Sequence, residues 1–470
     1  EISACLVGSE MCIRDRFIGD KKFYRLLFAI VMPIVLQQFI TQFVSLLDNL
    51  MVGQVGSSEM TGVSLANQIL FVFNLGIFGS LSGASIFATQ YFGAKDKKGY
   101  QETFRFKWLM GLVIFAITTI IVIIFNKQLI NFFINSQEGE FSNPGIVLES
   151  GRTYLLIMLV GNLPFIIKEI YATSLREMKE TFIPMLSGII AIVVNLFLNY
   201  LLIFGKWGFP KLGTSGAAIA TVVSRFVEMI FVIVYVKIKN KQFDYLNGVY
   251  QKILSFQSFK KFLPKTLLLL SNEVLWALSL TLILSCYALR GLDYVASFNI
   301  CNTVTNVFLT VGTSLGNATA IILGNKLGAK DISDAKASSY RILAFSIIVT
   351  IVFSFIMVGS SFILPNIYET SENIKEVARN LIIIGAIFLP VHAFNTCCYF
   401  VLRAGGRIVL TILFDSVFVL IVRLPLAFIL SKYTTMSIYI VYAIVDGIDF
   451  IKTFVGYILI DKGIWLKAII

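Results

Sequence analysis

The chain has 470 residues, of which 57% are apolar and only 14% are charged, and its mean hydropathy is +0.83. Soluble domains carry about 25% charged residues, so this composition excludes an ordinary soluble protein and indicates a membrane protein. The net charge of +12 would suit a nucleic-acid-binding protein, but the basic residues are concentrated in alternate loops between apolar segments, so we expect no nucleic-acid partner.

The apolar segments define the predicted elements from the N-terminus onward. A membrane-spanning helix needs roughly 20 predominantly apolar residues. Twelve segments reach this length, at about 24–50, 60–90, 104–125, 152–175, 182–204, 214–238, 263–288, 294–324, 341–363, 377–402, 408–431 and 436–460. The sequence therefore predicts an all-α polytopic protein with twelve transmembrane helices, whose first partner is the lipid bilayer.

Lysine and arginine are unevenly distributed among the loops. Three basic groups occur, which are Lys95, Lys97, Lys98, Arg105 and Lys107, then Lys237, Lys239, Lys241, Lys252, Lys260, Lys261 and Lys265, then Lys326, Lys330, Lys336 and Arg341. Residues 51–62, which connect the first and second apolar segments, carry no positive charge. Because cytoplasmic loops are enriched in lysine and arginine, these basic loops and both termini are expected in the cytoplasm. We expect a multi-pass protein of the plasma membrane.

Two short motifs occur twice, in the same order in each half of the chain. Gly-Ala-Lys-Asp occupies residues 93–96 and 328–331, each time after the second apolar segment of its half. A Leu-Pro pair precedes a Leu-Arg pair within residues 163–176 and again within 389–403. This repetition predicts two parallel six-helix repeats with a transport path between them. The glycine of Gly-Ala-Lys-Asp is interpreted as ending a helix before a charged turn.

The repeats suggest a division into domains. We predict an N-terminal six-helix lobe at 17–240, a cytoplasmic linker at 241–262 and a C-terminal six-helix lobe at 263–470. Residues 1–16 lack an initiator methionine and do not match the rest of the chain, so we expect them to be a non-native leader. The protein is expected to act as a monomer.

Motifs for catalysis and nucleotide binding are missing from the sequence. It contains no Gly-x-x-x-x-Gly-Lys-[Ser/Thr], no His-Glu-x-x-His and no Gly-x-Ser-x-Gly, and its loops are too short for a catalytic domain. The six cysteines show neither metal-ligand spacing nor a disulfide framework. We expect a protein that is not an enzyme, has no cofactor and draws any energy it uses from an ion gradient.

Three ionisable residues stand out inside the apolar segments. A charged side chain at the centre of a bilayer costs about 2.5–3.5 kcal/mol, so each one needs a reason. Asp48 has no cation within four positions on its helix, and Glu273 on the seventh segment is similarly unpaired. Both are candidates for binding a cation. His392, the single histidine, follows Pro390 on the tenth segment and is either a proton-linked group or a hydrogen-bonded neighbour.

Other intramembrane charges are expected to neutralise each other along their own helices. Arg225 and Glu228 lie three residues apart, and Asp446, Asp449 and Lys452 recur at the same interval. Residues three or four positions apart are neighbours on a helix surface. We therefore interpret both groups as structural.

Amide and hydroxyl side chains occur on the fifth and sixth segments. Asn195 and Asn199 are four residues apart and share one face, as do Ala217 and Thr221. Hard cations prefer oxygen ligands, so these side chains together with the carboxylate of Asp48 form a candidate sodium site. The alternative is that they join helices by hydrogen bonds, worth about 0.6 kcal/mol each in a membrane bundle.

The sequence resembles a known transporter family over residues 20–460. The matching stretches include LLDNLMVGQVG (46–56), SNEVLWALS (271–279), LGAKD (327–331) and the long run that begins with LREMKETF and ends with ATVVSR (175–225). They are similar to the multidrug and toxic compound extrusion (MATE) transporters. The resemblance implies two six-helix lobes around a central cavity and antiport of drugs or organic cations against Na⁺ or H⁺.

The resemblance also implies roles for single residues. Asp48 matches the first-helix acid that is tied to cation coupling, and Pro33 matches the first-helix proline that bends the helix. Asn195 matches the first residue of the family's Asn-x-x-x-Asp pattern, Thr221 resembles the sixth-helix hydroxyl ligand, and Glu273 resembles the seventh-helix acid. A proline in a helix removes a backbone hydrogen bond, so a hinge at this position is physically reasonable.

The sequence departs from the family pattern at three positions. Asn199 replaces the second aspartate of the fifth helix, Arg407 replaces another common aspartate, and the tenth-helix acid is missing, with His392 in that region. One carboxylate with neutral oxygens still suits Na⁺, though more weakly. H⁺ needs only Asp48, because burial favours the neutral form of a carboxyl group.

We therefore expect a cation-coupled antiporter that exports drugs or organic cations by alternating access. The alternatives are a lipid-linked precursor flippase of the same superfamily and a non-transporting membrane protein. Few arginines lie within the helices, which disfavours a flippase that must hold phosphate.

Overall fold

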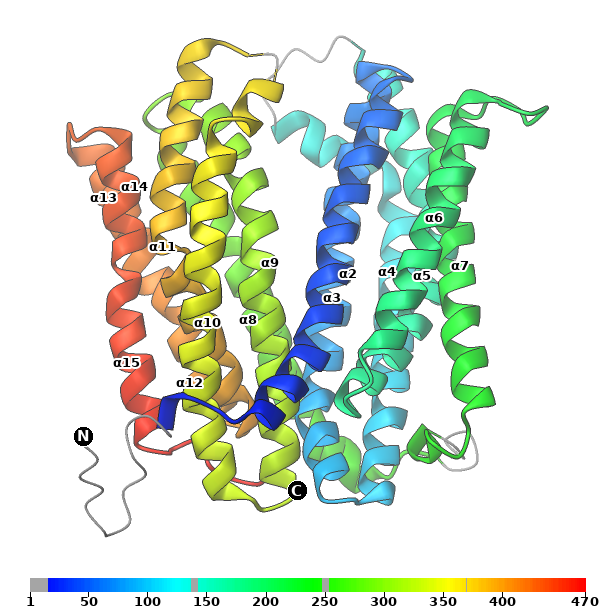
Figure 1. Ribbon diagram of the computed structural model, residues 1–470. Helices are drawn as coiled ribbons and strands as arrows, with labels where there is room; N and C mark the ends of the chain where they lie inside the picture. The colour runs from blue at the N-terminus through cyan, green and yellow to red at the C-terminus, as the bar shows by residue number, and fades with distance from the viewer. Residues whose placement is uncertain (1–15, 137–142, 247–252, 369) are drawn as a thin grey trace. The chain divides into compact units, whose positions relative to one another are not determined.

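The computed structural model describes residues 16–136, 143–246, 253–368 and 370–470, and every regular element in these ranges is helical (Figure 1). The long helices are α2 (Lys21–Gly53), α3 (Ser57–Gly93), α4 (Lys97–Ser136), α5 (Pro144–Glu177), α6 (Phe182–Phe204), α7 (Gly213–Ile238), α8 (Phe256–Ala288), α9 (Leu292–Gly328), α10 (Ile332–Ser361) and α11 (Glu372–Ala404). The remaining elements are the short helices η1 (Asp244–Leu246) and η3 (Leu364–Ile367), the stretch α12 (Ile408–Ile412), η4 (Leu413–Val417), η5 (Val419–Arg423) and α13 (Leu424–Tyr433), and finally α14 (Ile438–Gly447) and α15 (Asp449–Asp461).

Eleven helices of the described residues are long and apolar enough to cross a membrane. The eleventh runs from Ile408 to Tyr433 and contains the π-helical turns η4 and η5. The twelfth predicted segment is present as two helices, α14 and α15, which follow one another along one line in Figure 1 and are separated by Ile448. The predicted all-α membrane fold is confirmed, with the twelfth helix interrupted.

The chain divides into two compact units. The first unit, called the Asp48 unit, comprises Leu36–Ala88 and Lys97–Leu270. The second, called the His392 unit, comprises Thr89–Asp96, Ser271–Ile470 and the described part of Glu1–Val35. The division cuts α2 between Val35 and Leu36. The lobe boundaries at 17–240, 241–262 and 263–470 stay predictions, and the leader 1–16 lies outside the described residues except for its last residue.

The repeated Gly-Ala-Lys-Asp motif forms the same turn twice. Lys95 and Lys330 both adopt left-handed backbone conformations, with φ of 58° and 60°. In each turn the aspartate N–H donates to the carbonyl oxygen five residues earlier, at 2.9 Å and 3.0 Å. The glycine is the last helical residue in both copies, as predicted, but the residue with positive φ is the lysine two positions later.

The two glycines lie where α3 and α9 approach each other. A Cβ added at Gly93 would lie 1.9 Å from the carbonyl oxygen of Asn325, and one added at Gly328 would lie 1.9 Å from the carbonyl oxygen of Gln90. Both distances are far below van der Waals contact, so only glycine fits at either position. The contact is reciprocal, as an internal two-fold repeat requires.

The second repeated motif also forms matching structures. It ends α5 and α11, which contain Pro164 and Pro390 respectively. Three residues after the motif arginine, Lys179 and Gly406 have φ of 66° and 69°. The halves therefore share backbone conformations at two pairs of helix ends, which supports the predicted repeat.

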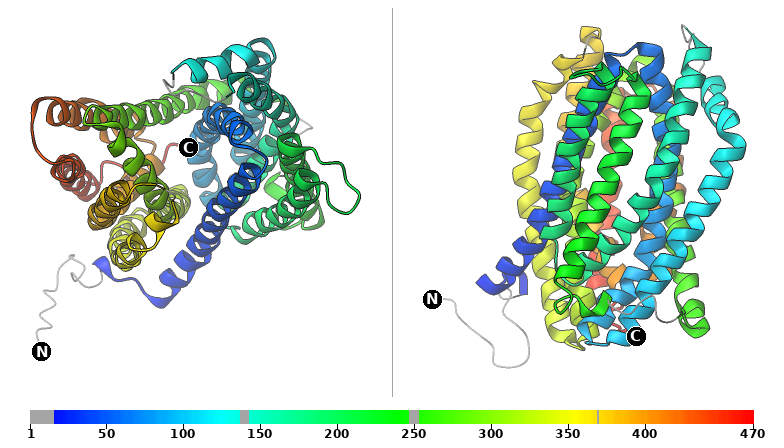
Figure 2. Two further views of the ribbon diagram at one scale, coloured as in Figure 1. Left: turned by 90° about the horizontal axis from the view of Figure 1, so that it is seen from above. Right: turned by 90° about the vertical axis from the view of Figure 1, so that its right-hand side faces the viewer.

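The core of the Asp48 unit lies between its helices. Helices α5, α6 and α7 pack side by side, as both views in Figure 2 show, and α4 packs on α5. Their buried residues form one apolar cluster with α2 and α3, which includes Val52, Leu65, Leu155, Ile203 and Ala218. This packing fixes α2, α6 and α7 as neighbours and so determines which polar side chains can meet.

The His392 unit has its own apolar core. Helix α11 packs against α9, α10, α14 and α15. The buried cluster includes Tyr287, Phe298, Met357, Leu381 and Tyr442, and the rings of Tyr287 and Phe298 stack with centroids 4.3 Å apart. Such burial of apolar and aromatic side chains between helices places α11 at the centre of this unit.

Candidate functional site

Asp48 lies on α2 and meets two asparagines of α6. The Nδ2 of Asn199 donates to Asp48 Oδ1 at 2.6 Å and also to Asn195 Oδ1 at 3.1 Å. Asn195 and Asn199 are 5% and 1% exposed, so they contribute buried polar atoms to this contact. Because these residues are four apart on one face of α6, their proximity was predictable from the sequence.

Helix α7 completes the cluster. The Nδ2 of Asn195 donates to Thr221 Oγ1 at 3.2 Å, and Thr221 Oγ1 donates to the backbone carbonyl oxygen of Ala217 at 3.0 Å. Ala217 is buried, and its small side chain belongs to the apolar core of the unit. The structure therefore brings together all five residues that were proposed from the sequence for cation coupling.

The Asn195 amide fits this cluster in two orientations. In the orientation given above, its Oδ1 faces Asp48 Oδ1. With the amide turned over, Nδ2 donates to Asp48 Oδ1 at 3.0 Å and Oδ1 accepts from Thr221 Oγ1 at 3.2 Å. Two facing oxygens need a proton between them, whereas an ionised carboxylate needs a donor. The first orientation suits a protonated Asp48. The second gives an ionised Asp48 a donor, but it loses the hydrogen bond from Asn199 and places the Nδ2 atoms of Asn195 and Asn199 3.1 Å apart.

No lysine, arginine or histidine nitrogen lies within 4 Å of Asp48 in the described part of the chain. The neighbours it has are neutral. Tyr154 on α5 interacts electrostatically with both Asp48 and Arg225 and borders Thr221. Tyr154 was not predicted from the sequence, because nothing in a tyrosine of an apolar segment shows that it will face α2 and α7.

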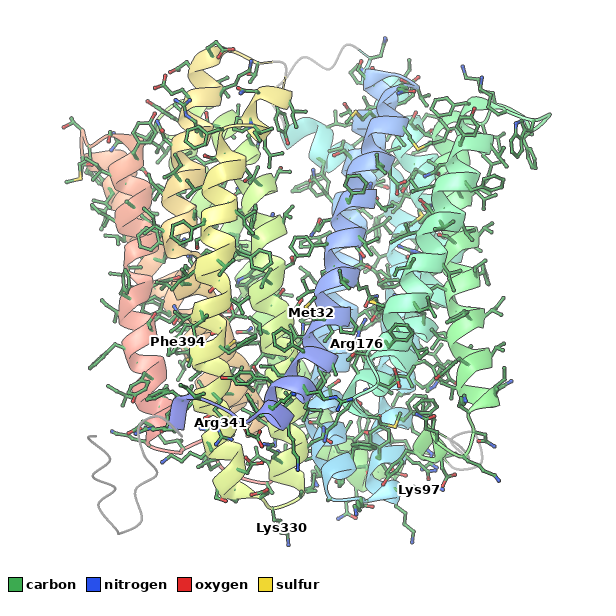
Figure 3. The ribbon with its side chains drawn as sticks, viewed as in Figure 1. Met32, Lys97, Arg176, Lys330, Arg341 and Phe394 are labelled. Atoms are coloured by element: carbon green, nitrogen blue, oxygen red, sulfur yellow. The ribbon has the colours of Figure 1, made fainter. Side chains whose placement is uncertain are left out.

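Basic residues of the Asp48 unit have partners of their own. The Nζ of Lys168 lies 2.6 Å from Glu169 Oε1 and 3.3 Å from Glu228 Oε1. Arg176, labelled in Figure 3, donates to Gln37 Oε1 at 3.1 Å. Arg225 donates to Asn162 Oδ1 at 3.0 Å and interacts electrostatically with Glu228, although no Arg225–Glu228 ion pair within 4 Å forms between these described residues. The partners therefore come both from the same helix, as for Lys168 and Glu169, and from neighbouring helices, as for Lys168 and Glu228.

Pro33 lies within α2, which continues through it from Lys21 to Gly53. The boundary between the two compact units falls two residues after it, between Val35 and Leu36. Pro33 therefore precedes the point at which α2 passes from one unit to the other. Asp48 lies on the part of α2 beyond that point.

Glu273 lies on α8 in the His392 unit and is 8% exposed. Tyr399 OH donates to Glu273 Oε1 at 3.4 Å, and Arg403 Nη1 donates to Tyr399 OH at 3.3 Å. Among the described residues, no basic nitrogen reaches Glu273 within the 4 Å of an ion pair. Glu273 is therefore buried beside the Tyr399 hydroxyl, and Arg403 contacts that hydroxyl rather than the carboxylate.

A second polar group adjoins Glu273. Asn272 Nδ2 donates to Asp415 Oδ2 at 3.3 Å, Ser416 Oγ donates to Asn272 Oδ1 at 2.7 Å, and Lys452 Nζ lies 3.0 Å from Asp415 Oδ1. Asp415 and Ser416 belong to the π-helical turn η4. The sequence does not reveal this group, because its members come from three helices far apart along the chain.

His392 on α11 lies between two aspartates. Its Nδ1 is 3.2 Å from Asp449 Oδ2, and its Nε2 is 3.8 Å from Asp446 Oδ2. Arg423 contacts both carboxylates, Asp446 through Nη2 and Asp449 through Nη1 at 3.5 Å. Lys452 interacts electrostatically with Asp449 along the helix, as expected, whereas the ion pairs within 4 Å are supplied by neighbouring helices.

Comparison with known proteins identifies the fold and the family. A family model described as MatE matches residues 33–201 and 268–429, which is more than half of the chain. The chain belongs to the MatE family. It is 22% identical to a probable multidrug resistance protein NorM of Oceanobacillus iheyensis over 88% of this chain and 91% of that protein, and 24% identical to one of Thermotoga maritima over 88% and 86%.

A solved structure agrees with the MatE assignment. An outward-facing multidrug resistance MATE family transporter of the MOP superfamily superposes with a TM-score of 0.83 and 17% identity, covering 97% of this chain and 99% of that one. The MatE family consists of membrane transporters and not enzymes. The chain is therefore a multi-pass membrane transporter, as predicted from the sequence.

A metal site in this MatE protein would depend mainly on neutral oxygens. In the described ranges, no group of three or more histidine, cysteine, aspartate or glutamate side chains could hold a metal ion. The predicted sodium site at Asp48, Asn195, Asn199 and Thr221 has one carboxylate and three neutral side chains, which is a different donor set. Sodium binding at this site stays a prediction.

Proposed function

We propose that this MatE transporter exports drugs or organic cations from the cell and is driven by H⁺ or Na⁺. Asp48 carries this proposal. It is a half-buried carboxylate on a membrane helix that has hydrogen bonds to neutral amides and no cationic partner in the described part of the chain. Such a residue is expensive in a membrane and is best explained by a cation that binds and leaves.

The neighbours of Asp48 suit either ion. The carboxylate, the two amide oxygens and the Thr221 hydroxyl could hold Na⁺, because hard cations take oxygen ligands. H⁺ would instead neutralise Asp48 and let the Asn195 amide present Oδ1 to it. We favour H⁺, because Asp48 is the one carboxylate among these side chains.

Pro33 would link this binding to movement. Occupation of Asp48 by a cation changes the charge on the segment of α2 that belongs to the Asp48 unit. The proline lies just before that segment and weakens the helix by removing a backbone hydrogen bond. A bend near Pro33 would reposition Asp48, so that cation binding and the conformation of α2 change together.

The substrate class rests on the relatives and on Glu273. The relatives are named as multidrug resistance proteins. Glu273, buried beside Tyr399, offers a negative charge and an aromatic ring, which together favour organic cations. We propose a plasma-membrane monomer with cytoplasmic termini, because the basic loops follow the positive-inside pattern. In the His392 unit, Lys330 and Arg341 lie towards the same end of the helices, at the bottom of Figure 3.

Dye efflux from proteoliposomes tests the proposal. The wild-type protein is expected to drive efflux of a cationic dye under a pH gradient or a Na⁺ gradient, and whichever gradient works names the ion. Asp48→Asn keeps the size and hydrogen-bonding capacity of the side chain but cannot bind H⁺ in this range or supply a charge. We expect efflux to fall at least tenfold with normal membrane expression.

The matched control is Glu149→Gln on α5, because Glu149 is a largely exposed acid with a side-chain exposure of 68%. It should transport like the wild type. Full efflux by Asp48→Asn would exclude Asp48 as the coupling residue. Efflux driven by neither gradient, with transfer of a lipid-linked substrate instead, would favour a flippase.

A further inference from the structure

Four charged or titratable side chains from four helical elements meet in the His392 unit. They are His392 on α11, Arg423 at the end of η5, Asp446 on α14 and Asp449 at the start of α15. The side chains of Asp446 and Asp449 are only 2% and 5% exposed, while those of Arg423 and His392 are 15% and 20% exposed. The group is distinct from the Asp48 cluster and from the Glu273 cluster.

The geometry of the cluster favours a protonated His392. Nδ1 faces Asp449 and Nε2 faces Asp446, so both ring nitrogens point at carboxylate oxygens. An ionised carboxylate only accepts hydrogen bonds, and a neutral imidazole can donate from only one nitrogen. At 3.2 Å and 3.8 Å these are ion-pair contacts, and carboxylates on both sides of the ring stabilise its positively charged form. This arrangement favours the imidazolium form of His392.

Charge balance leads to the same conclusion. Arg423 supplies one positive charge and the two aspartates supply two negative charges, so the group is neutral only when His392 holds its proton. A buried net charge is costly in a membrane unless it is paired. Loss of this proton would therefore leave one uncompensated negative charge among the helices.

Other titratable groups surround the cluster, but among the described residues none of them supplies the positive charge that the proton gives to His392. Tyr287 on α8, Cys301 on α9 and Tyr442 on α14 interact electrostatically with Asp446, but all three are neutral acids. Lys452 on α15 interacts with Asp449, yet its ammonium is bound to Asp415 at 3.0 Å. In the described part of the chain, His392 is the member of the group whose charge can change most readily.

The two aspartates flank the interruption of the last membrane helix. Asp446 is the penultimate residue of α14 and Asp449 is the first residue of α15, with Ile448 between the helices. Asn395 Nδ2 donates to the backbone carbonyl oxygen of Asp449 at 3.1 Å and so ties α15 to α11. A change of angle between α14 and α15 would move one aspartate away from the ring, and the proton would then be held less tightly.

We propose that His392, held by Asp446, Asp449 and Arg423, is a second proton-carrying site of this transporter, whose proton affinity depends on the angle between α14 and α15. The proposal rests on the proposed cation-driven transport and adds a site in the unit that does not contain Asp48. The proton enters and leaves through His392, the most exposed member of the group. Asp449 Oδ1 is buried and has no hydrogen-bond partner among the described residues, so this carboxylate keeps an unused acceptor within the cluster.

One experiment observes this proton directly. His392 is the single histidine of the 470 residues, so protein purified without a histidine tag and labelled with ¹⁵N-histidine gives one imidazole signal. At pH 7.5 a free histidine is mostly neutral. We expect both ring nitrogens of the wild type to be protonated at this pH, and the neutral tautomer to appear in Asp449→Asn. A neutral ring in the wild type at pH 7.5 overturns the proposal.

A second experiment separates a proton carrier from a structural cation. His392→Arg keeps a positive charge opposite the two carboxylates but cannot release a proton. We expect a thermal midpoint close to that of the wild type and a loss of pH-driven dye efflux of at least tenfold. Arg379→Lys, on the same helix with an exposed side chain, should transport normally. Wild-type efflux by His392→Arg would show that the charge alone matters and would overturn the proposal.

The outcomes distinguish this inference from the proposed function. If Asp48→Asn loses efflux while His392→Arg retains it, the coupling role of Asp48 stands and the second site falls. If a Na⁺ gradient drives wild-type efflux and a pH gradient does not, the second proton site is again excluded. Loss of pH-driven efflux in both variants, together with a protonated ring in the wild type, supports both sites.

Discussion

The residue at position 199 decides whether a second charged group lies beside Asp48, and in this chain it is a neutral asparagine. Its Nδ2 lies 2.6 Å from Asp48 Oδ1, at the position where the family resemblance led us to expect a second carboxylate. An amide at this distance stabilises an ionised Asp48 by a charge-assisted hydrogen bond. The identity of this one residue therefore bears on whether the site takes H⁺ or Na⁺.

Replacement of Asn199 by aspartate tests that dependence. In Asn199→Asp two carboxylates would lie within hydrogen-bond distance, and like charges so close cannot both ionise without a cation between them. We expect Na⁺ to raise the thermal midpoint of the variant by several degrees and to leave that of the wild type nearly unchanged. Asn199→Ala, which adds no charge, is the control. An equal response to Na⁺ in all three proteins would contradict the prediction.

At the scale of the helices, the close approach of α3 and α9 depends on two glycines. A side chain at Gly93 or Gly328 would meet the backbone of the other helix at 1.9 Å, and a backbone cannot rotate away as a side chain can. Overpacking of a close contact costs typically about 1–3 kcal/mol, and more when backbone must move. The contact also joins the two copies of the repeat at equivalent points.

Valine at either glycine should therefore destabilise the protein. We expect Gly93→Val and Gly328→Val to lower the thermal midpoint in detergent by similar amounts, because their surroundings are reciprocal. Gly359→Ala on α10 is the control, since a Cβ there meets nothing within 4 Å. A loss of stability in only one of the two valine variants would argue against an equivalent role of the two positions.

At the scale of the whole molecule, the distribution of basic residues predicts the orientation in the membrane. Lys330 is exposed on a basic turn and Gln54 is exposed in the turn between α2 and α3, where no positive charge occurs from 51 to 62. The four described cysteines are all free and buried, so they should react slowly with membrane-impermeant reagents. Introduced cysteines can thus report the side of the membrane.

We expect Lys330→Cys to be labelled only from the cytoplasmic side and Gln54→Cys only from the outside, in a background with Cys5 and Cys12 replaced. Intact cells and inverted vesicles provide the two sides, and the protein without introduced cysteines is the control. Labelling of both positions from one side would refute the predicted topology.

Composition and spacing within one helix were enough to predict the local features of this protein. Apolar length predicted the membrane helices, the repeated Gly-Ala-Lys-Asp predicted equivalent turns, and spacing of four placed Asn195 beside Asn199. Asp48 was identifiable because an unpaired acid in an apolar segment is costly wherever that helix packs. These properties are local, so no knowledge of the neighbours was needed.

The pairing of charges, in contrast, depends on how the helices pack. Lys452 pairs with Asp415 and His392 lies between Asp446 and Asp449, each across helices that are distant in the chain, and Lys168 reaches Glu228 of α7 in addition to its neighbour Glu169. The spacing rules that placed Asn195 beside Asn199 left Arg225 and Glu228 with an electrostatic interaction but no ion pair within 4 Å, because a long flexible side chain reaches neighbouring helices as easily as its own. For charges that are paired between helices, packing rather than position along one helix determines the partner.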